Sequence, residues 1–230
     1  MTPRLAWLAL ETSDLAVAAS LYRDTLDLDL VSTSDTEHAY RVGETRLVLR
    51  TPDHPTPGGA HVHYAFITGP DGFDYWVQQL SHDFDLTFHD FGTFQSLYWF
   101  GADEHCVEIA SLGEGGTALS GIFEVVLEVD DLGEAIPWYA QLGFTRGERD
   151  PDRPRIRLTS PQLDLELWEP HRGLADARPG KHVDLGIAVT GMNDIGADLT
   201  SNGTTPDSNP DRTEYEAPGG HRMTLIERGE

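Results

Sequence analysis

Residues 5–26 read LAWLALETSDLAVAASLYRDTL, and residues 122–142 read IFEVVLEVDDLGEAIPWYAQL. Each stretch begins with alternating residues, which predict a β-strand, and continues with Asp-Leu and a helix that carries Ala and Tyr on one face. Asp14 and Tyr22 of the first stretch match Asp131 and Tyr139 of the second, 117 residues further along. The chain is therefore predicted to consist of two similar halves.

Each half contains a second, weaker copy of the same pattern. Residues 61–80 and 182–199 both read as a strand, a turn containing Gly and a short amphipathic helix. Alternating runs that predict strands and hairpins follow each helix, at 40–50, 94–110, 156–168 and 213–227. The predicted unit is βαβββ, repeated four times.

The four units set the expected domain organisation. Units one and two cover 1–50 and 61–112 and form a domain over 1–112; units three and four cover 121–170 and 181–230 and form a domain over 121–230. Segments rich in Pro or Gly separate the units, at 51–60, 113–120 and 169–180. One unit is too small to bury a sheet face, so we expect an α+β fold in which the units pair into two cup-shaped mixed sheets with helices outside.

The charge balance is strongly acidic. The sequence has 39 acidic and 16 basic residues, a formal net charge of −23, and Lys181 is its single lysine. Acidity combined with scarce lysine is typical of halophilic proteins, whose surfaces need counterions. The composition lacks the basic footprint of a nucleic-acid-binding protein.

The sequence does not indicate a membrane-spanning, secreted or disulfide-bonded protein. No apolar run approaches the ~20 residues of a membrane helix, and the N-terminus does not resemble a signal peptide, so a cytoplasmic location is expected. The single cysteine, Cys106, excludes an internal disulfide and a CxxC zinc cluster.

The repeated D-L-x-x-A-x-x-x-Y element and the four βαβββ units resemble the vicinal oxygen chelate superfamily. This superfamily includes glyoxalase I, fosfomycin and bleomycin resistance proteins and extradiol dioxygenases. The resemblance covers essentially the whole chain and is nearest to two-domain catechol 2,3-dioxygenases. VHYAFIT (62–68) resembles their H-x-A-x-L strand, and YWFGADEHCVE (98–108) resembles their Y-x-x-D-P-x-G-N-x-I-E hairpin.

The resemblance implies a metal ligand on the first and last strand of each unit. The first-strand positions fall on Trp7, His63, Glu124 and Asp184; the last-strand positions fall near Val48 or Leu49, on Glu108, near Glu166 and on Thr224. Units two and three hold most of the ligand-type residues. We therefore predict one metal-binding cup from these two units, with His63, Glu108 and Glu124 as ligands and Glu166 as an optional fourth. The cup of units one and four is expected to be apolar and structural.

The same resemblance implies two catalytic residues, Tyr98 and His89. Tyr98 lies ten residues before Glu108, as the family pattern requires, and His89 lies upstream of it. The sequence also departs from the family. The D-P-x-G turn is replaced by GADE (101–104), Glu124 stands where a His is usual, and the histidine cluster expected on the last strands of unit three is missing.

Three functions follow from these expectations. The first, which the resemblance favours over the two alternatives, is extradiol cleavage of a catechol-like ring with Fe(II), which usually binds to two His and one carboxylate. The second is a glyoxalase-type isomerase or lyase with one divalent Zn, Ni, Mn or Co ion that acts as a Lewis acid. The third is a non-catalytic protein that binds a small molecule between Trp7, Trp76, Trp99 and Trp168. All three have a small-molecule partner, no nucleic acid and no membrane, with a homodimer as an option; metal content separates an enzyme from a binder.

Overall fold

The computed structural model describes residues 2–52, 62–149, 154–169, 183–192, 208–209 and 212–228, together with Ile195 and Leu199. The helices are α1 (Leu15–Ser20), α2 (Gly72–Leu80) and α3 (Leu132–Ala140). Short helical turns cover Leu21–Thr25 and Ala102–Glu104. Most of the region in which the fourth helix is expected lies outside the described residues. No helix in these described ranges is long and apolar enough to cross a membrane.

The strands of the described residues form two eight-stranded sheets, which we call sheet A and sheet B. Sheet A is built from units one and four. Its strands, in spatial order, are β14 (Ser208–Asn209), β15 (Arg212–Ala217), β16 (His221–Glu227), β13 (Val183–Val189), β1 (Arg4–Glu11), β4 (Thr45–Arg50), β3 (Glu37–Val42) and β2 (Leu30–Thr33).

Sheet B is built in the same way from units two and three. Its strands, in spatial order, are β10 (Thr145–Arg149), β11 (Arg155–Thr159), β12 (Asp164–Trp168), β9 (Gly121–Glu128), β5 (His63–Ile67), β8 (Cys106–Ala110), β7 (Gln95–Phe100) and β6 (Thr87–Asp90). Each sheet therefore combines one unit from each half of the chain. The division into domains at 1–112 and 121–230 stays a prediction, because sheet composition does not define where a domain ends.

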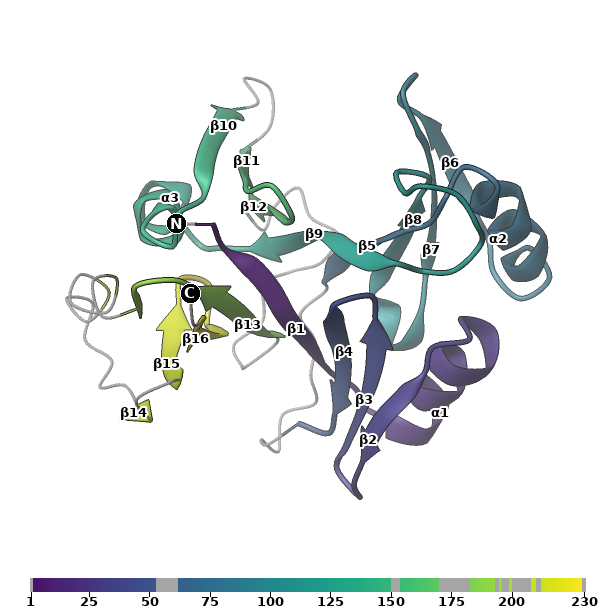
Figure 1. Cartoon of the computed structure of the whole chain (residues 1–230), viewed down its shortest axis with the longest axis horizontal. Coiled ribbons are helices and arrows are strands. Elements are labelled where there is room, and N and C mark those ends of the chain that lie inside the picture. The colour runs from purple at the N-terminus through teal and green to yellow at the C-terminus, as the bar shows by residue number, and fades with distance from the viewer. Residues whose placement is uncertain are drawn as a thin grey trace.

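The two sheets share one connection pattern. The first strands of the paired units run antiparallel at the centre, β1 beside β13 and β5 beside β9. Each first strand also pairs in parallel with the last strand of its own unit, as β1 does with β4 and β5 with β8. The sheets are thus mixed, and each bends into a U with its central strands at the base (Figure 1). The predicted α+β fold of four βαβββ units in two cups is confirmed.

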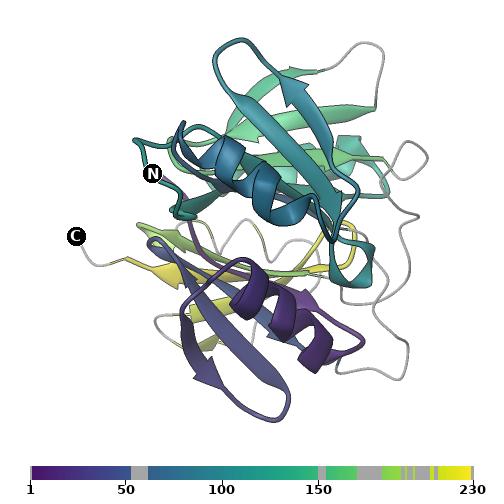
Figure 2. The same ribbon diagram turned by 90° about the vertical axis from the view of Figure 1, so that its right-hand side faces the viewer.

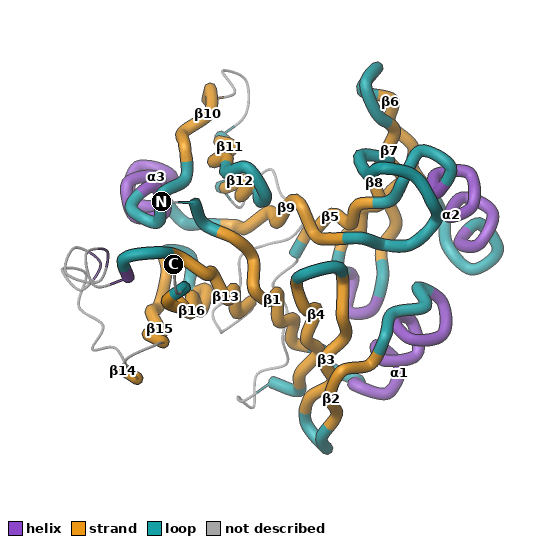
Figure 3. The backbone as a smooth tube through the Cα atoms, viewed as in Figure 1, coloured by secondary structure: helices purple, strands orange, loops and turns teal. Residues whose placement is uncertain are grey.

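The helices lie on the convex sides of the sheets, away from the inside of each U (Figures 2 and 3). On β8, Val107 and Ile109 point to this side and join the main core, whereas Glu108 points to the inner face. Apolar residues of both sheets form one continuous core cluster. The hydrophobic effect of burying it stabilises the contact between the two sheets.

The repeated Asp and Tyr have the same local roles in both halves. The Asp14 carboxylate caps α1 by accepting hydrogen bonds from the backbone N–H groups of Ala16 and Val17, each at 3.0 Å. Asp131 caps α3 through the N–H of Gly133 at 2.5 Å. Such caps satisfy the free N–H groups of a first helical turn. The equivalent tyrosines, Tyr22 and Tyr139, are buried in the core.

Candidate metal centre

Three ligand-type side chains meet at the base of sheet B. They come from its two central strands and the strand next to them: His63 from β5, Glu108 from β8 and Glu124 from β9. Ala65 is the register partner of both Glu108 and Glu124, and His63 lies two residues before Ala65 on the same face of β5. The small Ala65 side chain therefore separates two carboxylates that project to the same side.

The three side chains are buried and close together. The His63 Nε2 atom lies 3.1 Å from Glu108 Oε2 and 3.5 Å from Glu124 Oε1. One ligand atom of each residue lies within 4.8 Å of those of the other two. The residues are 3–6% exposed, so water cannot balance the charge of the two carboxylates. A divalent cation would do so, and imidazole with carboxylates is an ordinary ligand set for Zn²⁺, Mn²⁺ or Fe²⁺.

The pKa shifts in this group come from its burial and its internal contacts. Burial alone would lower the pKa of His63, but hydrogen bonds to Cys106, Glu108 and Glu124 outweigh burial and raise this pKa well above its ordinary value. Burial would likewise raise the pKa of Glu124, but the hydrogen bond with His63 and the charge of Arg157 lower it. In the absence of a metal, a proton on His63 therefore supplies part of the missing positive charge.

Arg157 of β11 contributes the second positive charge. Its Nη2 atom lies 2.6 Å from Glu124 Oε2, and its Nη1 atom lies 3.3 Å from Asp164 Oδ2. It is also the register partner of Glu166, whose Oε1 atom lies 3.7 Å from Nη2. The Arg157 side chain is 44% exposed, whereas that of Glu124 is 7% exposed, so the guanidinium reaches the buried carboxylate from the open side of the sheet.

Tyr98 lies beside the three ligand-type residues. It is the register partner of Glu108 across β7 and β8, and its ring stacks on His63 with the centroids 5.7 Å apart. Burial first, and then the charge of Glu108, raise the pKa of Tyr98, so its hydroxyl stays protonated and can donate. His89 of β6 is exposed and contacts the Tyr98 ring edge-on, with the centroids 5.3 Å apart.

The structure thus brings together His63, Glu108 and Glu124, as the uneven distribution of ligand-type residues predicts, and places Tyr98 next to them. His89 lies further out, on the edge strand. Glu166 is not part of the group, because it accepts a hydrogen bond from Trp168 Nε1 at 2.7 Å and pairs with Arg155 at 3.3 Å. That these residues bind a metal or catalyse a reaction stays a prediction.

Sequence reasoning missed Arg157. The signal is present in the hairpin RIRLTSPQLDLELW (155–168), where arginines alternate on one strand and carboxylates alternate on the other. Side chains at alternate positions share a face, so opposite charges on a hairpin are expected to meet.

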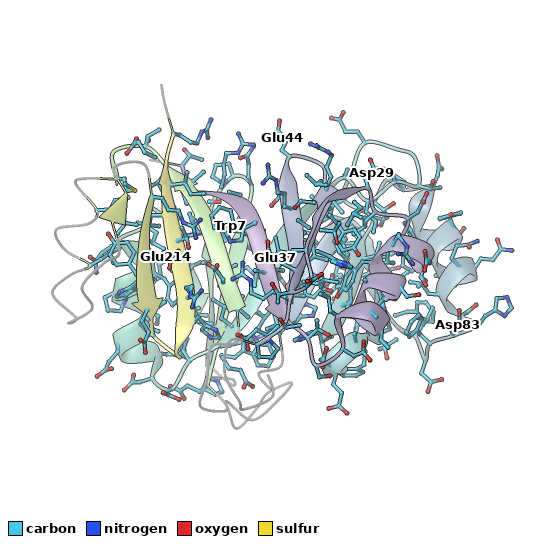
Figure 4. All side chains as sticks on the ribbon, turned by 90° about the horizontal axis from the view of Figure 1, so that it is seen from below. Trp7, Asp29, Glu37, Glu44, Asp83 and Glu214 are labelled. Atoms are coloured by element: carbon cyan, nitrogen blue, oxygen red, sulfur yellow. The ribbon has the colours of Figure 1, made fainter. Side chains whose placement is uncertain are left out.

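The expectation that the cup of units one and four is apolar is wrong. Its inner face carries an ion pair between Arg50 Nη1 and the buried Asp184, at 3.1 Å. Thr224 donates a hydrogen bond to the other Asp184 oxygen at 3.1 Å, and Glu37 lies 3.0 Å from Arg50 Nη2. Figure 4 shows Trp7, Glu37 and Glu214 on the strands of sheet A.

Comparison with known proteins gives a match in structure but not in sequence. No family profile and no curated sequence matches the chain significantly. A candidate dioxygenase from Bacillus subtilis superposes with a TM-score of 0.72 and 11% identity, covering 100% of this chain and 86% of the other. Glyoxalase I from Zea mays superposes with a TM-score of 0.69 and 15% identity, covering 98% of this chain and 92% of the other.

The chain shares its fold with these two proteins, as the resemblance to the vicinal oxygen chelate superfamily predicts. The two matches extend over nearly the whole chain, so all four units take part in the resemblance and not a single pair. At these identities, the activity of a vicinal oxygen chelate protein does not transfer from its fold. A function for this chain therefore has to be argued from its own residues.

Proposed function

We propose that this chain is a metal-dependent enzyme whose divalent ion is held by His63, Glu108 and Glu124. The observation that carries the proposal is the buried group of one imidazole and two carboxylates at the base of sheet B. When bound, the ion would act as a Lewis acid that polarises an oxygen of the substrate. One imidazole with two carboxylates favours a redox-inactive ion, so glyoxalase-type isomerase or lyase chemistry is the function that this site supports best.

The protein's own groups provide further functions in such a reaction. The Tyr98 hydroxyl, next to Glu108, is a hydrogen-bond donor for a substrate oxygen on the inner face of sheet B. The carboxylates of Glu108 and Glu124 share the inner face of sheet B and would be the proton acceptors for a bound substrate, although each would accept a proton at the cost of metal affinity. Arg157 and Arg155 surround the site with positive charge, which limits the net negative charge that the four nearby carboxylates produce.

Extradiol cleavage of a catechol-like ring is the second candidate. The position of Tyr98 against His63, with His89 beside the Tyr98 ring, favours this reaction, because both side chains carry hydrogen-bond donors for the oxygens of a substrate. The single imidazole speaks against it, since the usual iron site of such oxygenases has two histidines and one carboxylate. The third candidate is a non-catalytic protein that binds a small molecule between tryptophans. The structure gives it little support, because Trp76 and Trp99 are buried in the core.

Elemental analysis of protein purified without chelators tests the metal site. The wild type is expected to carry a stoichiometric divalent ion, and H63A and E108A are expected to lose it. Equal metal in the three proteins would refute the assignment. Two assays then separate the candidate reactions in protein loaded with Fe(II), Mn(II), Ni(II), Co(II) or Zn(II). Oxygen uptake with catechols tests extradiol cleavage, and isomerisation of the thiohemiacetal of an α-keto aldehyde tests glyoxalase-type chemistry.

A further inference from the structure

The two oxygens of Glu124 have different partners. Its Oε1 atom lies 3.5 Å from His63 Nε2, inside the ligand group. Its Oε2 atom lies 2.6 Å from Arg157 Nη2, on the side of β11. The carboxylate therefore spans the boundary between the ligand group and a charged hairpin.

Arg157 is held in place by more than Glu124. Its Nη1 atom pairs with Asp164 at 3.3 Å, and its Nη2 atom is 3.7 Å from Glu166. These contacts use the planar fork of the guanidinium, which a lysine cannot reproduce. Burial would lower the pKa of Arg157, but the neighbouring carboxylates raise it, so the group stays charged.

Glu108, the other carboxylate of the group, has a different environment. Among the ion pairs of residues in the described ranges, it pairs with His63, at 3.1 Å, and with no arginine. The two carboxylates are thus not equivalent: one is tied to a guanidinium through one oxygen, and the other is not.

We infer that Arg157 keeps the Oε2 oxygen of Glu124 in an ion pair, so that this carboxylate can bind a metal ion through one oxygen instead of two. The inference rests on the proposed metal site. A carboxylate can bind a cation through one or both oxygens, and each additional protein oxygen takes a position that a substrate oxygen would otherwise use. Arg157 is on this view a positioning residue that keeps the ion accessible to substrate.

The test uses Co(II), whose visible absorption becomes weaker as the number of ligands rises. Wild type, R157M, R157K and R155M are loaded with Co(II), and its affinity is measured by chelator competition. Arg155 is the matched control, because it is the neighbouring arginine on the same face of β11 and pairs with Glu166 at 3.3 Å. Unfolding midpoints of all four proteins establish that they fold.

R157M is expected to bind Co(II) about 3-fold to 10-fold more tightly, because the ion no longer competes with a guanidinium for Glu124. Its absorption is expected to weaken, as both Glu124 oxygens become available. R157K, which keeps the charge without the fork, is expected to lie between R157M and wild type, and it serves as the test if R157M does not fold.

Two results would overturn the inference. One is a Co(II) spectrum and affinity in R157M and R157K equal to those of wild type. The other is the same change in R155M, which would indicate a general charge effect. If wild-type protein binds no Co(II), the proposed metal site itself fails, and Arg157 then serves only to neutralise Glu124.

Discussion

Sheets A and B have the same register but carry chemically different residues at equivalent positions. Ala65 of sheet B faces Glu108 and Glu124, and Ala9 of sheet A faces Val48 and Asp184. Two residues before each alanine stand His63 in sheet B and Trp7 in sheet A. The ligand group His63, Glu108 and Glu124 thus corresponds to Trp7, Val48 and Asp184.

The difference shows how each sheet balances a buried carboxylate. In sheet A, the guanidinium of Arg50 and the hydroxyl of Thr224 satisfy Asp184. In sheet B, the register position of Arg50 is held by Ala110 and that of Thr224 by Glu166. Among the described residues, Glu108 pairs with His63 and with no guanidinium, and a metal ion can take the place that Arg50 has in sheet A.

Trp7 closes the equivalent place in sheet A. Its ring lies so close to Gly186 that a Cβ atom there would be 2.3 Å from it, and the Arg212 guanidinium lies over the ring at 5.2 Å from the centroid. The partly buried Trp7 also packs against a small cluster of Ala9, Ala39 and Val48. Sheet A is therefore filled by its own side chains.

The largest expected effect is the loss of the cation in sheet A. R50A leaves Asp184 buried without its charge partner, and we expect the free energy of unfolding to fall by about 3 kcal/mol. Urea denaturation measures it. R46A, on the same strand and exposed, is the control and should change stability by less than about 0.5 kcal/mol. A similar small change in R50A would mean that the ion pair does not neutralise Asp184 as described.

Filling the space next to Trp7 is expected to have the next largest effect. G186A places a methyl group where the Trp7 ring lies, and overpacking of this kind costs about 2 kcal/mol. Tryptophan fluorescence should also change, because the ring must move. In a W7A background the same substitution should cost much less. An equal cost in both backgrounds would show that the ring is not the obstacle.

Sheet A should gain a metal site when its register positions are converted to those of sheet B. We expect W7H/V48E/R50A to bind a divalent ion in sheet A at least about 10-fold more tightly than W7H/V48E, a difference of ~1.4 kcal/mol. In the double variant, Arg50 still forms its ion pair with Asp184, so this carboxylate is less available to the metal ion. Calorimetric titration with Zn(II) or Mn(II) measures this affinity in an E108A background, which removes the candidate site in sheet B. Equal binding by the two variants would contradict the role given to Arg50.

The smallest expected effect concerns the contact between the two sheets. His105 Nε2 donates to the Glu11 carbonyl at 3.4 Å, and the N–H of Val62 donates to His105 Nδ1 at 3.4 Å. Burial lowers the pKa of His105, so below about pH 6.5 the unfolded chain takes up a proton more readily than the folded one. The contribution of His105 to stability should therefore fall as the pH drops from 7 to 5.

H105N should reduce this pH dependence, whereas H89N, at an exposed position, should leave it unchanged. Chemical denaturation at several pH values between 5 and 7 measures both. Parallel curves for wild type and H105N would exclude His105 as the source. The repeat places an equivalent contact in the other half, where His221 Nε2 lies 2.7 Å from the Glu128 carbonyl.

Much of the fold and the three ligand-type residues follow from the sequence alone. Four βαβββ patterns with an Asp-Leu cap signal specify local structure, since alternation and capping depend on neighbours along the chain. Alternation also puts His63, Glu108 and Glu124 each on a definite face of its strand. The resemblance supplies the ligand positions, and the uneven distribution of ligand-type residues over these positions predicts which two units bring them together.

Only the tertiary structure decides which charges meet. Arg50 and Asp184 are 134 residues apart, and Arg157 reaches Glu124 across an intervening strand. The resemblance implied Glu166 as an optional fourth ligand, yet register places it opposite Arg157 and against Trp168, where it is neutralised and does not join the ligand group. The physical reason is that a period of two residues fixes the face of a side chain but not its neighbour on the next strand. Because charges interact strongly only over a few ångströms, this neighbour determines whether a buried carboxylate is balanced by a guanidinium or is available to a metal ion.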